Sequence, residues 1–383
     1  MNRREFLAST TAGAVVFAGS VYAENETPIP EEMPPLETPQ WAAAQIDEVR
    51  QRIDAWKGTD VGVVFPLVSD IHAGNPGFSE TPDFRDTKTH VRILQRAATQ
   101  IQADFMAELG DIGFDRDSHW NPSTPEHAQK RLASQQLLYR DFSLPVLFCM
   151  GNHDTGRAFG GVFGGKRLSN REYGEMFNGQ TRGKGFPLVV GPNGDYGYYD
   201  LPGKPCRVFF LNSSEAGERG YSQEQVQFLA DHLRMPKDFC AVVLQHISIH
   251  RSLGPWLPAT QSAKISYGET ARTVLEAFVQ KEKGEKDGVR WDFTQNQNTT
   301  LAGCIFGHSH FGNQIYERGV HYILTQSYGT IHDENLPDFA DYTRFGRKES
   351  LLCDIVVLKP AQREMRIFRL GAGGAEKDRD FHF

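Results

Sequence analysis

The sequence is poor in the features that mark several common classes of protein. Its five cysteines show no Cys-x-x-Cys spacing, and their odd number leaves at least one unpaired, which argues against a disulfide framework. It has no excess of positive charge: a net charge of -7 and a pI near 6.0 argue against a nucleic acid polymer as the main partner. With 39% hydrophobic and 23% charged residues, the composition is typical of a soluble globular protein.

The cysteines themselves lie inside apolar runs that look like strands. They are Cys149, Cys206, Cys240, Cys304 and Cys353. Free cysteine behaves as a small hydrophobic residue and is often buried. The sequence therefore predicts five buried thiols.

The N-terminus has the pattern of an export signal. Residues 3–7, Arg-Arg-Glu-Phe-Leu, precede a mild apolar run that reaches Ala23, and residues 21–23 fit a cleavage site with small residues. The segment resembles a twin-arginine signal peptide over residues 1–23, with a general secretory signal as the alternative. We expect an exported protein, periplasmic or extracellular, whose mature form has no membrane segment.

The remaining chain divides into three parts. Residues 24–40 are rich in Pro and Glu and are predicted to form an exposed tether. Residues 41–372 are predicted to form one domain, which begins with a helix over 41–57 and ends in short strands. Residues 373–383 are expected to be a C-terminal tail, and nothing in the sequence indicates the oligomeric state.

Within the domain, apolar runs of strand length alternate with helical patterns. The strand runs are 61–69, 105–110, 145–150, 207–211, 241–244 and 301–306, and the helical patterns are 90–103, 125–142, 223–233 and 270–280. This alternation predicts an α/β fold with sheets covered by helices. Four later runs, 313–317, 321–325, 351–358 and 364–370, look like antiparallel strands that finish a second sheet.

Residues able to bind metal ions follow five of these strand runs. They are Asp70, His72, Asp111, Asn152, His246, His308 and His310, with His153 beside Asn152. Residues i and i+2 of an extended segment point to the same side, so Asp70 and His72 can hold one ion. Nitrogen and oxygen ligands without thiolate suit manganese, iron or zinc better than calcium. His250 competes with His246 for the role of ligand.

In order and in type, these motifs match the calcineurin-like metallophosphoesterase family: Asp-x-His, Gly-Asp, Gly-Asn-His-Asp, a lone His and Gly-His-x-His. The resemblance covers residues 61–310 and implies a four-layer αββα sandwich with two mixed β-sheets, the metallo-dependent phosphatase fold. It also implies two divalent or trivalent metal ions. One would be bound by Asp70, His72 and His310, the other by Asn152, His246 and His308, with Asp111 bridging them and His153 facing the substrate.

The resemblance implies a metal-dependent phosphoric ester hydrolase. Its substrate would be a small phosphomonoester or phosphodiester, attacked in line by a metal-bridging hydroxide. The motifs do not separate this activity from that of cyclic-nucleotide phosphodiesterases, which share them. The alternative to an enzyme is a non-catalytic metal-binding scaffold of the same fold. Such family members typically lose a ligand or the catalytic histidine, and this chain keeps both.

One position departs from the family pattern. Many members have Asp or Asn, which can orient the catalytic histidine, where this chain has Phe114. Either Asp115 takes over that role, or His153 lacks such a partner. Arg157 is a candidate phosphate-binding residue, against the alternative of a solvated loop residue, and Asp154 is expected to shape its loop rather than to bind metal.

Overall fold

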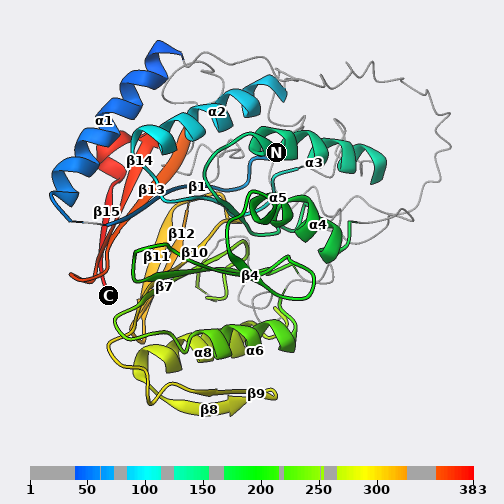
Figure 1. The fold of residues 1–383 in the computed structure, drawn as a ribbon, viewed down its shortest axis with the longest axis vertical. Helices are drawn as coiled ribbons and strands as arrows, with labels where there is room; N and C mark the ends of the chain where they lie inside the picture. The colour runs from blue at the N-terminus through cyan, green and yellow to red at the C-terminus, as the bar shows by residue number, and fades with distance from the viewer. Residues whose placement is uncertain are drawn as a thin grey trace, which may run out of the picture. The chain divides into compact units, whose positions relative to one another are not determined.

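The structure, a computed structural model, describes residues 39–60, 62–72, 84–113, 125–154, 168–214, 220–250, 252–253, 265–325 and 351–383. These residues form two mixed β-sheets and a separate two-stranded hairpin (Figure 1). The six-stranded sheet has the order β15-β14-β13-β1-β2-β3. The seven-stranded sheet has the order β11-β12-β10-β7-β6-β5-β4.

The strands of the six-stranded sheet are β1 (Val63–Val68), β2 (Met106–Glu108), β3 (Val146–Phe148), β13 (Leu352–Lys359), β14 (Glu364–Gly371) and β15 (Arg379–His382). Those of the seven-stranded sheet are β4 (Leu188–Val190), β5 (Gly197–Asp200), β6 (Cys206–Phe210), β7 (Cys240–Gln245), β10 (Thr300–Phe306), β11 (Asn313–Glu317) and β12 (Val320–Leu324). The hairpin consists of β8 (Lys283–Lys286) and β9 (Val289–Asp292).

The described helices are α1 (Gln40–Lys57), α2 (Phe84–Gln100), α3 (Pro125–Arg140), α4 (Asn170–Met176), α5 (Asn178–Gly183), α6 (Gln223–His232) and α8 (Gly268–Gln280), with a 3₁₀ helix η5 (Gly374–Lys377). Polar residues define where some of them begin. The Ser222 side chain accepts a hydrogen bond from Gln225 N at the start of α6, and Ser169 and Glu172 form a capping box on α4.

Each sheet contains a run of neighbouring parallel strands, at one end of the six-stranded sheet and in the middle of the seven-stranded sheet. β1, β2 and β3 are parallel to one another, and so are β6, β7, β10 and β12. Every residue of β1 and of β7 is buried, because both faces of each sheet are covered. This burial explains why the sequence shows continuous apolar runs there rather than alternation.

The elements stack in four layers, as Figure 1 shows, with α1, α2 and α3 on one outer side and α6 and α8 on the other. One core cluster lies between the two sheets and includes Phe65, Leu244 and Val356. A second cluster, with Val243 and Phe278, lies between the seven-stranded sheet and α6 and α8. The predicted four-layer α/β class is confirmed.

The expected grouping of the last four strands was wrong. β11 and β12 join the seven-stranded sheet, whereas β13 and β14 join the six-stranded sheet, where β13 pairs with β1. In addition, β12 pairs with β10 in parallel rather than antiparallel orientation. Local patterns identify strands, but the sheet that each strand joins depends on contacts between residues that are distant in the sequence.

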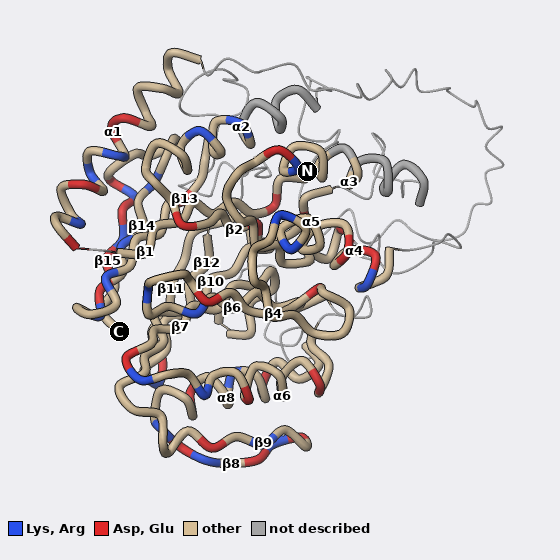
Figure 2. The backbone as a smooth tube through the Cα atoms, in the orientation of Figure 1, with Lys and Arg blue, Asp and Glu red and all other residues tan. Residues whose placement is uncertain are grey.

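Two segments without a strong local pattern also form strands. Residues 373–383, expected to be a tail, contain η5 and β15, and β15 pairs with β14 while Phe381 enters the core. The β8–β9 hairpin carries acidic and basic residues along both strands (Figure 2), so it shows no apolar run.

Two further expectations concern the whole chain. All five cysteines are buried and unpaired, which confirms the prediction of buried thiols. Among the described helices, none combines the length and the apolar character needed to cross a membrane.

Candidate metal centre

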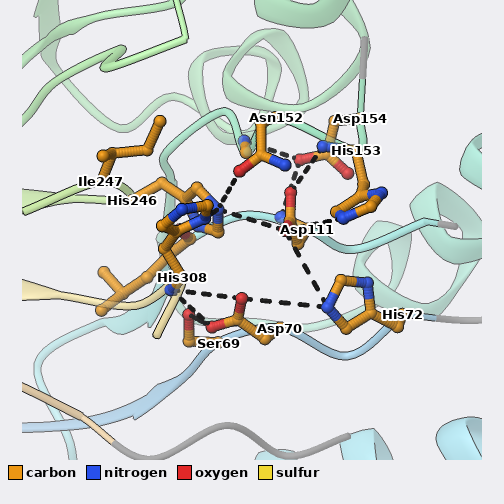
Figure 3. A network of polar contacts seen from close by, with 12 residues as sticks. Ser69, Asp70, His72, Asp111, Asn152, His153, Asp154, His246, Ile247 and His308 are labelled. Atoms are coloured by element: carbon orange, nitrogen blue, oxygen red, sulfur yellow. Dashed lines mark hydrogen bonds and ion pairs between the residues drawn. The ribbon is translucent and has the colours of Figure 1, made fainter. Parts of the chain in front are cut away.

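The predicted ligands converge on one edge of the two sheets. Asp70 and His72 follow β1, Asp111 follows β2, Asn152 and His153 follow β3, His246 follows β7, and His308 and His310 follow β10. The carboxyl ends of parallel strands meet at the same edge of a sheet, which is where ligands bind in such folds. Figure 3 shows most of these side chains pointing toward a common centre.

The first ligand group consists of Asp70, His72 and His310. His310 Nε2 lies 3.2 Å from Asp70 Oδ1 and 3.1 Å from His72 Nε2, and His72 Nε2 lies 3.9 Å from Asp70 Oδ1. Strands from both sheets contribute, because Asp70 and His72 follow β1 and His310 follows β10.

The second ligand group consists of Asp111, Asn152, His246 and His308. His246 Nε2 lies at its centre, 3.2 Å from Asp111 Oδ2, 3.1 Å from Asn152 Oδ1 and 3.3 Å from His308 Nδ1. The same Asp111 oxygen lies 3.9 Å from His72 Nε2 of the first group. A single carboxylate oxygen is thus placed to be shared by the two groups.

The donor atoms fit metal ions. Two ligands bound to one ion at about 2.1 Å each stand roughly 3.0 to 3.4 Å apart in octahedral or tetrahedral geometry. Five of the distances within the groups, from 3.1 to 3.3 Å, agree with this spacing, whereas His72 Nε2 and Asp70 Oδ1 lie further apart at 3.9 Å. The donors are imidazole nitrogens and carboxylate or amide oxygens, a set that suits manganese, iron or zinc.

Five of these residues have the left-handed backbone conformation that side chains other than glycine rarely adopt. They are Asp70 (φ 55°), His72 (φ 49°), Asp111 (φ 54°), His308 (φ 67°) and His310 (φ 62°). Such strained positions cost free energy and cluster at functional sites. They occur in the loops after β1, β2 and β10, which carry the first ligand group and Asp111. This clustering supports a functional site at this edge of the sheets.

Neighbouring groups hold the carboxylate of Asp70 in place, and His308 N contacts both of its oxygens. Ser69 Oγ donates to Asp70 Oδ2 at 2.5 Å, and His308 N donates to the same oxygen at 2.9 Å (Figure 3). Gly307 makes this approach possible, because a Cβ there would lie 1.8 Å from Ser69 Oγ. No feature of the sequence pointed to this role of Ser69, since serine is common in turns.

Asp111 and Asp154 hold each other's loops in place. Asp154 Oδ1 accepts hydrogen bonds from the backbone N–H groups of Ile112 (2.8 Å) and Gly113 (3.1 Å), and its Oδ2 accepts from those of Asp111 (3.0 Å) and Gly151 (2.9 Å). In return, Asp111 Oδ1 accepts from the backbone N–H of residue 153 at 2.7 Å. Asp111 Oδ2 therefore remains directed at the two ligand groups.

Of the two competing histidines, His246 lies in the second ligand group and His250 lies outside both groups. His246 Nδ1 lies 2.8 Å from Leu109 O, an arrangement in which Nδ1–H donates and Nε2 is left as a ligand atom. His250 Nε2 lies 2.6 Å from Glu317 Oε2, and its ring contacts Tyr322. Sequence alone left these two histidines in competition, because both follow the same strand.

Charges in the site shift several pKa values. Burial holds the pKa of His72 well below its usual value, so its imidazole is neutral. Burial alone would also lower the pKa of His246, but the Asp111 carboxylate outweighs it and raises that pKa to about 9. Burial opposes ionisation of Asp111, yet His246 and His153 keep its pKa well below the usual range. A metal ion would take the place of the His246 proton.

His153 lies at the rim of the cluster. Its side chain is 10% exposed, and its Nε2 lies 3.9 Å from Asp111 Oδ2. Its ring meets the ring of His72 edge-on, with centroids 4.9 Å apart. Phe114, Asp115 and Arg157 lie outside the described residues, so the expectations about them stay predictions.

Comparison with solved structures finds chains with a similar fold. The chain is similar to a dimetal phosphatase from Danio rerio, with 12% identity, 84% of this chain and 99% of that chain covered, and a TM-score of 0.54. A purple acid phosphatase from yellow lupin (Lupinus luteus) seeds shows 11% identity over 85% of this chain and 53% of that chain, with a TM-score of 0.46. At these identities the likeness concerns the fold alone.

Comparison of the sequence with known proteins gives the family. No curated protein matches the sequence. The model of the calcineurin-like phosphoesterases matches residues 65–312, a range that includes every residue of both ligand groups. Because this range is more than half of the 383 residues, the protein belongs to the calcineurin-like phosphoesterase family.

Proposed function

We propose that the protein is an exported phosphoesterase that uses two metal ions to hydrolyse small phosphomonoesters or phosphodiesters. The observation that carries this proposal is the convergence of seven nitrogen and oxygen donor residues in two groups that share Asp111 Oδ2. Asp70, His72 and His310 would hold one ion, and Asn152, His246 and His308 the other. Manganese, iron and zinc are the ions that fit these donors.

The chemistry follows from this arrangement. Two ions held there would polarise the phosphoryl group and lower the pKa of the attacking water. Asp111, shared between the groups, would fix the separation of the two ligand sets. His153, at the partly exposed rim, would donate a hydrogen bond to the phosphoryl oxygens or a proton to the leaving oxygen.

Hydrolysis of p-nitrophenyl phosphate and bis(p-nitrophenyl) phosphate by manganese-loaded protein tests the activity. We expect turnover of at least one ester, and the ratio of the two rates would show the preference for monoester or diester. Absence of turnover on both esters, with two ions bound, would support a non-catalytic scaffold instead. A subsequent screen that includes cyclic nucleotides would test the cyclic-nucleotide phosphodiesterase alternative.

His153→Ala separates the catalytic role of His153 from a structural one. We expect turnover to fall about 100- to 10,000-fold, the usual range for a general acid, with the content of bound manganese unchanged. Metal content is measured by elemental analysis of the same sample. Parallel loss of metal and activity would instead make His153 a structural residue or a ligand.

Export is proposed on the sequence of residues 1–23 alone. Replacing Arg3 and Arg4 by Lys should leave the precursor in the cytoplasm, because twin-arginine recognition depends on this pair. Cell fractionation with immunodetection measures the distribution. Unchanged export would point to the general secretory route.

A further inference from the structure

A cluster of polar and charged side chains, buried except for the partly exposed Arg379, lies beside the metal centre and outside the residues that match the family. It consists of Thr325, Asp354, Arg369 and Arg379, all beyond residue 312. Asp354 is fully buried, and Thr325 and Arg369 are 1% and 3% exposed. Charged residues are rarely buried to this degree unless they are paired.

The contacts of Asp354 join the two sheets. Thr325 Oγ1, which follows β12 of the seven-stranded sheet, donates to Asp354 Oδ2 at 2.9 Å. Arg369 Nε donates to Asp354 Oδ1 at 2.8 Å, and Arg379 Nη2 donates to Asp354 Oδ2 at 3.2 Å. Arg379 Nη1 also donates to the carbonyl of Leu324, the last residue of β12, at 3.2 Å.

This cluster lies one strand away from the loops that carry the first ligand group. Asp354 pairs in register with Leu67 of β1, three residues before Asp70. On the facing sheet, Leu324 pairs with Phe306 of β10, and Thr325 N donates to Phe306 O at 2.8 Å, two residues before His308. The ends of β1 and β10 are therefore flanked by two strands that the cluster ties together.

Apolar packing alone does not determine the alignment of the two sheets at this edge. Between the sheets the core is formed by apolar side chains such as Val356 and Ile323, and hydrophobic burial has no directional preference. Hydrogen bonds to charged groups are directional and stronger than neutral ones. A bonded carboxylate at this position therefore restricts sliding of one sheet over the other.

From these contacts we infer that Asp354 and Thr325 are positioning residues for the first ligand group, a conclusion that rests on the proposed two-ion function. Asp70 and His72 come from one sheet and His310 from the other, so a shift between the sheets separates them. Ligand sets must be held to within about 0.5 Å of their productive geometry. The cluster keeps the ends of β1 and β10 at the separation that lets these residues bind one ion.

Thr325→Val tests the inference, because valine has the shape of threonine without its hydroxyl. Thr299→Val is the matched control: Thr299 is 3% exposed, and its Oγ1 accepts from Lys281 Nζ at 2.8 Å. Thr299 directly precedes β10, at the end of that strand opposite His308. Both variants thus lose one buried hydroxyl that is hydrogen-bonded to a charged side chain, and the two hydroxyls lie at opposite ends of the sheet.

Two measurements are compared for wild type, Thr325→Val and Thr299→Val. In the metal-free protein, Thr325→Val should raise the hydrogen-exchange rate of residues 69–72 and 307–310, whereas Thr299→Val should not. In manganese titrations, Thr325→Val should weaken one of the two binding events about tenfold, at the lower end of the range for residues that support metal ligands. It should weaken the other binding event less, because β2 and β7 do not neighbour the strands β13 and β12 that the cluster joins. Asp354→Asn should show both effects more strongly if it folds.

The inference is overturned if folded Thr325→Val matches wild type in both measurements, or if Thr299→Val changes them equally. A wild-type protein that binds fewer than two manganese ions would contradict the proposed function instead. In that case the exchange rates of the metal-free proteins still decide whether the cluster positions the loops. Failure of Asp354→Asn to fold leaves the decision with Thr325→Val.

Discussion

The two ligand groups differ in how firmly the protein holds them before an ion arrives. In the second group, His246 is fully buried and its Nδ1 contacts Leu109 O. In the first group, the His310 side chain is 14% exposed, and its Nδ1 has no hydrogen-bond partner among the described residues. We conclude that the second group is preorganised, whereas the first depends more on the ion.

The largest expected effect comes from the residue that both groups share. Asp111→Asn removes the bridging charge, so both ions should be lost and turnover should fall by at least about 1,000-fold, since bound metals supply several kcal/mol of transition-state stabilisation. Elemental analysis and p-nitrophenyl phosphate hydrolysis measure the two effects. Asp141→Asn, which removes an exposed carboxylate, is the control and should change neither.

The comparison between the groups is tested directly by His246→Ala and His310→Ala. Each variant should bind one manganese ion instead of two. The ion that remains in His310→Ala occupies the preorganised group and should bind at least about tenfold more tightly than the ion that remains in His246→Ala. Isothermal titration calorimetry gives both affinities, and equal values would show that the groups do not differ in preorganisation.

A smaller effect is expected at the residue that holds the Asp111 loop. Asp154→Asn keeps the size of the side chain but turns an NH₂ group toward backbone N–H donors, so the loop should shift and manganese affinity should fall about 10- to 100-fold. The far-ultraviolet circular dichroism spectrum should stay that of the wild type. Wild-type affinity in a folded variant would show that the loop needs no such support.

The smallest effect concerns pH. In the metal-free protein the pKa of His246 is raised to about 9, so the charged His246–Asp111 pair stabilises the fold. This contribution is complete below the unfolded pKa, near 6.5, and is lost as pH rises through about 9. Thermal melts of the metal-free protein should show the loss between these values, and His246→Ala should remove it. Manganese binding should show the opposite trend and strengthen as pH rises, because binding displaces the proton.

Local chemistry in the sequence was sufficient to indicate the residues that the fold gathers at the candidate metal centre. Asp70 and His72, two positions apart after an apolar run, already point to one side of an extended segment. The alternation of strands and helices likewise indicated the α/β class, because a strand that is buried on both faces consists of a continuous run of apolar residues.

Tertiary structure decided the features that depend on contacts between distant segments. Only the fold directs His246 to Asp111 and His250 to Glu317, because both residues follow β7 and differ in what lies opposite them. The same holds for Asp354, a single acid in an apolar run whose partners come from three other strands or their ends. The sequence by itself identified candidate metal ligands and the apolar runs that contain the central strands. The packing of two sheets against each other decided which of those residues meet, since register and separation arise from contacts that no local pattern encodes.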